Sequence, residues 1–309
     1  MKILGTGLRG LVGSRIVELL KDGYEFEVSD IDITDRHRVL EGIKNSDAQV
    51  VLHLAAKTDV DGCEEDKKRD IEILRYKDIE RQEKEWGDKK TAWAVNVVGT
   101  ENIADACQVS NKKLIYISTD FVFDGTNPPD NGYSEEDTPD PINWYGKTKY
   151  EGEKIVQELP TSWLIVRIAY PYRGKFEKLD FFRAILNRLQ KGEKVIAVTD
   201  HIFTPTFIDD IAFAIDCLIR KKEKGLFHVV GSQALSPFEA AVVIAKVFGY
   251  DQKAISKTTR LEFFKNRSPR PFQLTMNNDK IERLGIKMKT FEEGVKAVKG
   301  QMSKFKSTS

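Results

Sequence analysis

The sequence predicts a doubly wound α/β fold of the Rossmann type, a parallel sheet with a smaller substrate domain interleaved in the C-terminal half. The first observation is a short apolar strand at residues 2–4, which runs into a glycine-rich loop and then into a segment with helical apolar spacing. The second is the run at residues 49–54, which is apolar on both faces, as strands of a parallel sheet are. The third is the continued alternation of such strands with helical segments, which indicates helices on both faces of one sheet.

The other elements follow in order along the chain. Residues 24–28 alternate apolar and charged side chains and form a second strand, which ends at Ser29 and Asp30. A helix is expected to begin near Thr34. Beyond residue 90 we expect helices at residues 92–109, 144–159, 181–189, 211–219 and 237–248, and strands at 114–117, 164–168, 194–198 and 226–230. A last amphipathic helix is expected near residues 291–298, with a frayed end after Gly300.

A dense run of charged side chains at residues 64–90 interrupts this alternation. It carries only a sparse apolar stripe of Ile71, Leu74 and Ile79, so we interpret it as a solvated helix or helical hairpin inserted in a loop. A solvent-facing excursion is the simpler interpretation, and an arm that binds a partner protein is the alternative.

The order of elements also predicts how the chain divides into domains. We expect a dinucleotide-binding Rossmann domain from residues 1–170, with a return segment near 200–232. Residues 171–199 and 233–309 would form the smaller substrate-binding domain. Ligands of two-domain α/β proteins commonly bind in the crevice between the domains, so the substrate should lie there.

The composition excludes several classes of function. The chain of 309 residues has 49 basic and 48 acidic residues and a net charge of +1, so no long-range field favours nucleic acid or an anionic membrane as a partner. No apolar run is long enough to span a bilayer. Cys63, Cys107 and Cys217 are far apart and show no metal-ligand spacing, so we expect no metal site, reduced thiols and a cytoplasmic location.

Three glycines mark the loop after the first strand. Gly7, Gly10 and Gly13 stand between a strand and a helix, where missing side chains let the backbone approach a pyrophosphate at the helix N-terminus. Asp30, at the end of the next strand, would bind an adenosine ribose and repel a 2′-phosphate, which favours NAD. Arg9 would instead pair with that phosphate and favour NADP, so the choice between the two cofactors stays open.

A second group of polar residues points to proton transfer. The strand predicted at residues 114–117 is followed directly by Ser118, Thr119 and Asp120. Ligands bind at the carboxyl ends of strands in such sheets. Tyr145 and Lys149 lie four residues apart on the next helix, so their phenol and ammonium share one face. The hydroxyl and the phenol are therefore expected to converge beside the cofactor.

These motifs resemble those of the extended short-chain dehydrogenase/reductases and, within them, the dTDP-4-dehydrorhamnose reductases. The resemblance covers about the first 210 residues and rests on Thr6 to Gly13, Asp32 to Asp35, His53 to Ala56, Ala94 to Thr100, Ser118 to Gly125, Tyr145 to Lys149, and Pro205-Thr206.

The resemblance implies a catalytic role for three residues. Tyr145 would give its proton to a substrate carbonyl as a hydride arrives from the nicotinamide. Thr119 would donate a hydrogen bond to the same carbonyl oxygen. Lys149 would hold the nicotinamide ribose and, as a nearby cation, make the Tyr145 phenolate easier to form.

The binding residues that it implies fall into two sets. An NADP or NAD cofactor would contact Gly7, Arg9, Gly10, Leu11, Val12, Gly13, Asp30, Asp32, Ile33, Leu54, Ala55, Ala56, Asn96, Tyr145 and Lys149. Asn96 orients a water or caps a helix bend, and both interpretations stay open. A nucleotide-sugar substrate would contact Asp120, Phe121, Tyr170 and Arg173, since an aromatic face suits a sugar or base and a guanidinium suits a diphosphate.

Several positions depart from the pattern of the reductases. Phe121 fits them, because the dehydratases usually carry Glu there, but Ile168-Ala169-Tyr170 stands where the family tends to have Thr-Ser-Trp. We therefore expect an NAD(P)H-dependent reductase of a keto-sugar nucleotide, as in the last step of dTDP-rhamnose synthesis, and leave the substrate open. An epimerase or dehydratase, and a non-catalytic regulator similar to the methionine adenosyltransferase β subunit, are the alternatives. A homodimer is the common outcome for such enzymes.

Overall fold

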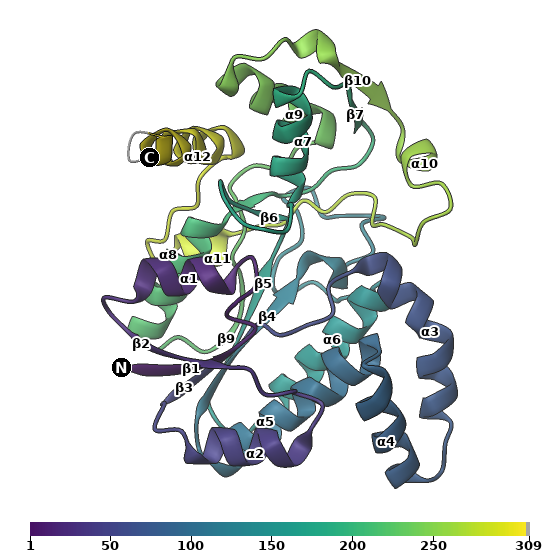
Figure 1. Ribbon diagram of the computed structural model, residues 1–309, viewed down its shortest axis with the longest axis vertical. Helices are drawn as coiled ribbons and strands as arrows, with labels where there is room; N and C mark the ends of the chain where they lie inside the picture. The colour runs from purple at the N-terminus through teal and green to yellow at the C-terminus, as the bar shows by residue number, and fades with distance from the viewer. Residues whose placement is uncertain (307–309) are drawn as a thin grey trace.

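A six-stranded parallel sheet forms the larger lobe of the computed structural model, which describes residues 1–306 (Figure 1). The strands lie in the order β2-β1-β3-β4-β5-β9 and each pairs with its neighbours in parallel. Their bounds are β1 Lys2–Thr6, β2 Glu25–Ser29, β3 Val50–His53, β4 Lys113–Thr119, β5 Trp163–Ile168 and β9 Gly225–His228. The strand order reverses beside β1, which is where such sheets bind their ligands. The predicted Rossmann-type fold is confirmed.

Helices cover both faces of the sheet because successive strand residues point to opposite sides. Leu4 and Val51 pack under one layer of helices, and Ile3 and Leu52 pack under the other. The first layer consists of α2 Arg36–Asn45, α5 Gly99–Val109 and α6 Trp144–Gln157. The second consists chiefly of α1 Gly13–Leu20 and α8 Ile208–Arg220. The carboxyl ends of the strands are left open between the layers.

The charged segment at residues 64–90 is a helical hairpin, α3 Val60–Leu74 and α4 Ile79–Lys89 (Figure 1). The prediction that it is a solvent-facing excursion is wrong for α3, because the carboxylate of Asp70 is fully buried beside α6. After the hairpin the expected helix at residues 92–109 begins with a π-helical turn, Ala94–Val98, before α5.

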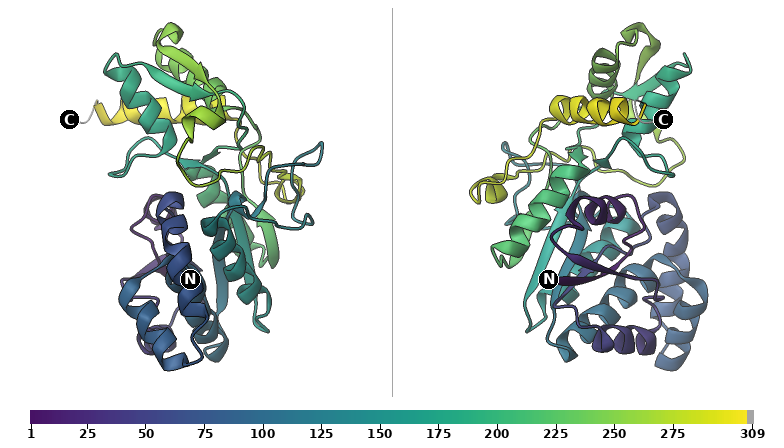
Figure 2. Two further views of the ribbon diagram at one scale, coloured as in Figure 1. Left: turned by 90° about the vertical axis from the view of Figure 1, so that its right-hand side faces the viewer. Right: turned by 60° about the vertical axis from the view of Figure 1, so that its left-hand side comes forward.

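The smaller lobe lies at one end of the sheet in every view (Figure 2). Its core packs aromatic and aliphatic side chains such as Tyr172, Phe182 and Phe291. Its elements are α7 Phe181–Gln190, β7 Val195–Val198, α9 Pro237–Phe248, β10 Ile255–Thr258 and α12 Phe291–Lys306. Two short strands, β6 Pro171–Tyr172 and β8 Thr206–Phe207, pair where the chain passes between the lobes.

The remaining helices are short, and the end of the chain differs from expectation. Two single-turn helices, α10 Arg260–Phe263 and α11 Asp279–Glu282, lie in the irregular segment before α12. The predicted fraying after Gly300 is wrong through Lys306, where α12 continues, and residues 307–309 lie outside the described part. No helix within residues 1–306 is long and apolar enough to cross a membrane.

Candidate active site

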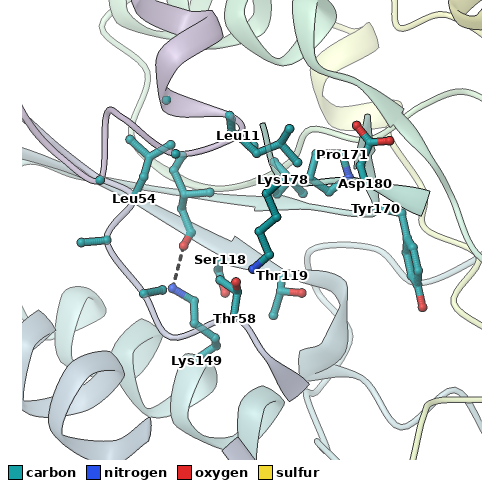
Figure 3. A pocket seen from close by; sticks show the side chains of 18 of the residues that line it. Leu11, Leu54, Thr58, Ser118, Thr119, Lys149, Tyr170, Pro171, Lys178 and Asp180 are labelled. Atoms are coloured by element: carbon teal, nitrogen blue, oxygen red, sulfur yellow. Dashed lines mark hydrogen bonds between the residues drawn. The ribbon is translucent and has the colours of Figure 1, made fainter. Parts of the chain in front are cut away.

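A cavity of about 670 Å³ lies at the carboxyl ends of β1, β3, β4 and β5 (Figure 3). One wall is the glycine loop after β1, and the opposite wall consists of the end of β4 and the first turns of α6. The segment that leads from β6 to α7 closes the side toward the smaller lobe. Its lining contains these predicted site residues: Gly7, Arg9, Gly10, Leu11, Val12, Gly13, Leu54, Ala55, Ala56, Thr119, Asp120, Phe121, Tyr145, Lys149 and Tyr170.

The glycine loop fits a dinucleotide pyrophosphate. Gly7 has a φ of +70°, and a Cβ on it would lie 2.6 Å from the backbone nitrogen of Ala55. A Cβ on Gly13 would lie 2.6 Å from the Cα of Leu8, so both glycines are required by close backbone packing. No side chain caps the N-terminus of α1. The Ser14 and Arg15 amides donate to the Gly10 and Val12 carbonyls, so the loop and the first turn of α1 form one compact backbone unit at the end of β1.

Arg9 and Asp30 form an ion pair with each other. In the sequence, Arg9 favoured NADP as the cofactor and Asp30 favoured NAD. The guanidinium of Arg9 lies 2.7 Å from the Asp30 carboxylate, and the two side chains are 76% and 61% exposed. An exposed pair of this kind contributes little, about 0–1 kcal/mol, so it opens readily for a ligand. Arg9 lines the cavity, whereas Asp30 does not.

Three other residues predicted to bind the cofactor lie off the cavity. Asp32 pairs with Lys90 at the end of α4, and Ile33 is buried against Gly99. The side chain of Asn96 accepts a hydrogen bond from the Lys57 amide at 2.8 Å and donates to the Thr148 hydroxyl at 3.0 Å. Asn96 therefore joins the segment after β3 to α6.

The three predicted catalytic residues meet at one wall of the cavity (Figure 3 shows Thr119 and Lys149). Thr119 ends β4 and donates a hydrogen bond to Asp120 Oδ1 at 3.0 Å. Tyr145 and Lys149 lie on the first two turns of α6, whose N-cap Asn143 accepts a hydrogen bond from the Gly146 amide. The ammonium of Lys149 donates to the Ile117 carbonyl at 2.8 Å and lies 4.0 Å from the Tyr116 ring centroid.

Burial sets the charge of these groups. It raises the pKa of the Tyr145 phenol well above its usual value, and a hydrogen bond with Thr119 offsets part of that rise. It lowers the pKa of Lys149 to about 7, against the opposing effect of Glu153, and raises the pKa of Asp120 to about 7. Tyr145 therefore keeps its proton at neutral pH, as a general acid must. Desolvation is the largest influence on the phenol pKa, and the expected lowering by Lys149 is not seen.

Aromatic side chains line the cavity on the side toward the smaller lobe. The Phe121 ring meets the Tyr145 ring edge-on at 5.7 Å and lies 6.0 Å from the Tyr170 ring. Tyr170 has a φ of 38°, in the left-handed region, and its hydroxyl lies 3.1 Å from His201 Nε2. His201 Nδ1 also hydrogen-bonds the Pro271 carbonyl, so both ring nitrogens of His201 have partners within the protein.

Arg173 does not line this cavity. Its guanidinium donates to the Leu11 carbonyl at 3.3 Å and to the Ser14 hydroxyl at 2.9 Å, and it pairs with Glu18 at 3.1 Å. It borders a neighbouring cavity of about 550 Å³ beside α1. Arg173, which was predicted to bind a diphosphate, thus hydrogen-bonds the glycine loop and the first turn of α1 on the side away from the cavity.

Sequence reasoning missed some residues that line the cavity. Thr58 follows β3, and the rule that ligands bind at carboxyl ends of strands points to it. Lys178 points into the cavity from the segment before α7 (Figure 3), and no motif in the sequence marks it. Among the described residues, no group of three or more His, Cys, Asp or Glu side chains is placed to hold a metal ion.

Comparisons with known proteins agree with this geometry. Residues 1–77 and 71–303 match the protein family described as the RmlD substrate binding domain. The chain belongs to this family. The resemblance to the dTDP-4-dehydrorhamnose reductases, predicted from the motifs, is thereby confirmed.

Relatives of this RmlD family chain include reductases and proteins of other descriptions. It is 28% identical to a probable low-salt glycan biosynthesis reductase of Haloferax volcanii, over 98% of both chains. It is 29% identical to the methionine adenosyltransferase 2 subunit beta of Mus musculus, over 96% of this chain and 86% of that protein. Among solved structures, a dTDP-4-dehydrorhamnose reductase from Bacillus anthracis in complex with NADP matches with a TM-score of 0.83 and 29% identity, over 97% of this chain and 99% of that one.

Proposed function

We propose that the protein is an NAD(P)H-dependent oxidoreductase that reduces the keto group of a nucleotide sugar, as a dTDP-4-dehydrorhamnose reductase does. The observation that carries the proposal is the placement of Thr119, Tyr145 and Lys149 on one wall of a cavity whose other wall is the glycine loop. The family and the similarity to named reductases support the same reaction.

The residues of the cavity have separate tasks in this reaction. A bound nicotinamide cofactor would supply a hydride to the carbonyl carbon. Tyr145 gives its phenolic proton to the carbonyl oxygen, and the Thr119 hydroxyl donates a hydrogen bond to that oxygen as its charge develops. Lys149 provides a cation, or a hydrogen-bond donor when neutral, on the same face of α6.

The two ligands would occupy different ends of the cavity. The glycine loop and the residues after β3, Leu54 to Ala56, would hold the dinucleotide, with Arg9 at its adenosine end. Asp120, Phe121 and Tyr170 would face the sugar, because they border the catalytic hydroxyls from the side of the smaller lobe. Arg173 acts behind the glycine loop and is no longer proposed as a substrate ligand.

The test is oxidation of NADPH or NADH, followed by the absorbance of the reduced nicotinamide, with a panel of 4-keto sugar nucleotides. We expect turnover with at least one member of the panel, and product analysis should show a hydroxyl in place of the keto group. Oxidation of neither cofactor with any member would refute the proposal and favour a non-catalytic role.

A further inference from the structure

Four carboxylates of the charged helix α3 are bound to other parts of the molecule. Asp61 accepts a hydrogen bond from the Ser268 amide at 3.0 Å, and Asp66 accepts one from the Ala92 amide at 2.8 Å. Glu64 Oε2 accepts from the Trp144 amide at 2.7 Å. Asp70 Oδ2 accepts from the Trp93 amide at 3.1 Å. The contact of Glu64 with Trp144 places α3 against the N-terminus of α6.

Trp144, the residue immediately before Tyr145, is held at both its main chain and its side chain. Its amide donates to Glu64, and its indole Nε1 donates to Asp70 Oδ2 at 2.8 Å. The indole also stacks on Trp93 with ring centroids 5.7 Å apart. The main chain of Trp144 is therefore held by α3, and its indole is held by α3 and by Trp93.

The position of Tyr145 depends on such outside contacts because it lies in the first turn of α6. First-turn amides have no partner within their own helix, so external acceptors decide where the turn lies. The Glu64 carboxylate is one such acceptor, and its negative charge also suits a helix N-terminus. Neither Glu64 nor Asp70 lines the cavity, so neither is placed to touch a substrate or a cofactor.

We propose that Glu64 and Asp70 are positioning residues of the reductase, which fix the Tyr145 phenol through Trp144. The inference rests on the proposed function and extends it to a helix outside the cavity. It also assigns a role to the charged segment: α3 supports the catalytic helix.

The test compares variants that remove the acceptor with variants that keep it. Glu64→Ala and Asp70→Ala should lower kcat about 10- to 100-fold, because misplacing a reacting group by an ångström costs about that much. The KM for the cofactor should change less than about 2-fold, since the glycine loop is untouched. Glu64→Gln should recover most of kcat, because its amide oxygen accepts the same hydrogen bond. Glu65→Ala is the matched control, because Glu65 lies on the exposed side of α3.

A second readout does not depend on turnover. Hydrogen exchange of the amides at residues 143–149 should be faster in Glu64→Ala than in the wild type and unchanged in Glu65→Ala. If the alanine variants do not fold, Trp144→Phe replaces them in the test. It keeps a ring to stack on Trp93 and removes the N–H group that donates a hydrogen bond to Asp70. It should lower kcat and leave the cofactor KM unchanged.

The possible outcomes are distinct. An unchanged kcat in Glu64→Ala or Trp144→Phe, or a loss that appears in the cofactor KM instead, would overturn the positioning role. A Glu64→Gln variant as inactive as Glu64→Ala would also overturn it, because the hydrogen bond would then not be the cause. A wild-type protein that turns over no keto-sugar nucleotide would refute the proposed function, and the exchange experiment would still show whether Glu64 fixes the first turn of α6.

Discussion

Tyr145 is the proposed proton donor, and its surroundings keep the proton on it until a carbonyl arrives. The phenol is buried, which raises its pKa, and the Thr119 hydroxyl is its hydrogen-bond partner. We expect Tyr145→Phe to lower kcat by about 10²- to 10⁴-fold, the usual contribution of a positioned acid. Cofactor affinity, measured by quenching of protein fluorescence, should stay within about 2-fold of wild type. Retained turnover would show that another group supplies the proton.

Two buried groups of the cavity change charge near neutrality. Burial raises the pKa of Asp120 to about 7 and lowers that of Lys149 to about 7. Above neutral pH, Asp120 becomes an anion beside Tyr145 and opposes the developing phenolate, while Lys149 loses its positive charge. We therefore expect kcat/KM to fall as the pH rises above about 7, and to fall less steeply in Asp120→Asn. Profiles of equal steepness would contradict a role for Asp120.

We propose that the exposed pair of Arg9 and Asp30 decides between the two nicotinamide cofactors in the proposed site. A 2′-phosphate would take Arg9 from Asp30 and form a charge-assisted hydrogen bond, so Arg9→Ala should raise the KM for NADPH about 10-fold. The KM for NADH should change little, because a ribose hydroxyl makes no such bond with Arg9. Asp30→Ala should lower the KM for NADPH by removing repulsion. Equal effects on both cofactors would show that the pair does not read the phosphate.

At the scale of elements, α6 approaches the turn after β4 so closely that only glycine fits between them. A Cβ on Gly146 would lie 2.1 Å from the Phe121 carbonyl oxygen. We expect Gly146→Ala to destabilise the fold by about 1–3 kcal/mol, the usual cost of overpacking, and to lower kcat by moving Tyr145 away from Thr119. Urea unfolding and steady-state kinetics measure the two effects.

Gly300 provides the matched control for that substitution. It lies in α12, and a Cβ on it would meet no atom of the described part of the chain within 4 Å. Gly300→Ala should raise stability by about 0.4–1 kcal/mol, because alanine loses less chain entropy in a helix. Equal destabilisation by both substitutions would mean that the contact with Phe121 is not the cause.

Elements with a local signal could be predicted from the sequence. The glycine loop and the pair of Tyr145 and Lys149 depend on spacings of three and four residues, and both lie where the pattern indicated. The role of α3 could not be predicted, because charged residues are usually solvated and only the fold shows that Asp70 faces an indole. The contacts of Arg173 could not be predicted either, because its partners, Leu11 and Ser14, are more than a hundred and fifty residues away in the sequence.

At the scale of the whole molecule, the two domains, which we predict to be interleaved, should not unfold separately. The chain passes between the lobes more than once, and the pairing of β6 with β8 and the ion pair of Asp61 with Arg270 at 3.0 Å add links between distant segments. We therefore propose that the interleaved pair behaves as one cooperative unit, and we expect a single unfolding transition.

The distribution of tryptophan makes this test selective. All four tryptophans, Trp86, Trp93, Trp144 and Trp163, lie within residues 1–170, so their fluorescence reports on the predicted Rossmann domain. Far-ultraviolet circular dichroism reports on the helices of both lobes. The urea midpoints from the two signals should coincide. A dichroism transition that is separated from the fluorescence transition would show that the smaller lobe unfolds by itself.

The number of residues in the π-helical turn Ala94–Val98 determines which way the Asn96 side chain points. Its widened turn contains Asn96, whose side chain bonds both Lys57 and Thr148. Deleting one residue there would restore regular α-helical winding and rotate everything before it by about 100° relative to α5. Asn96 would then point away from α6. The length of this turn is therefore under stronger constraint than its composition, and insertions or deletions should be tolerated far better in the loop between α3 and α4 than here.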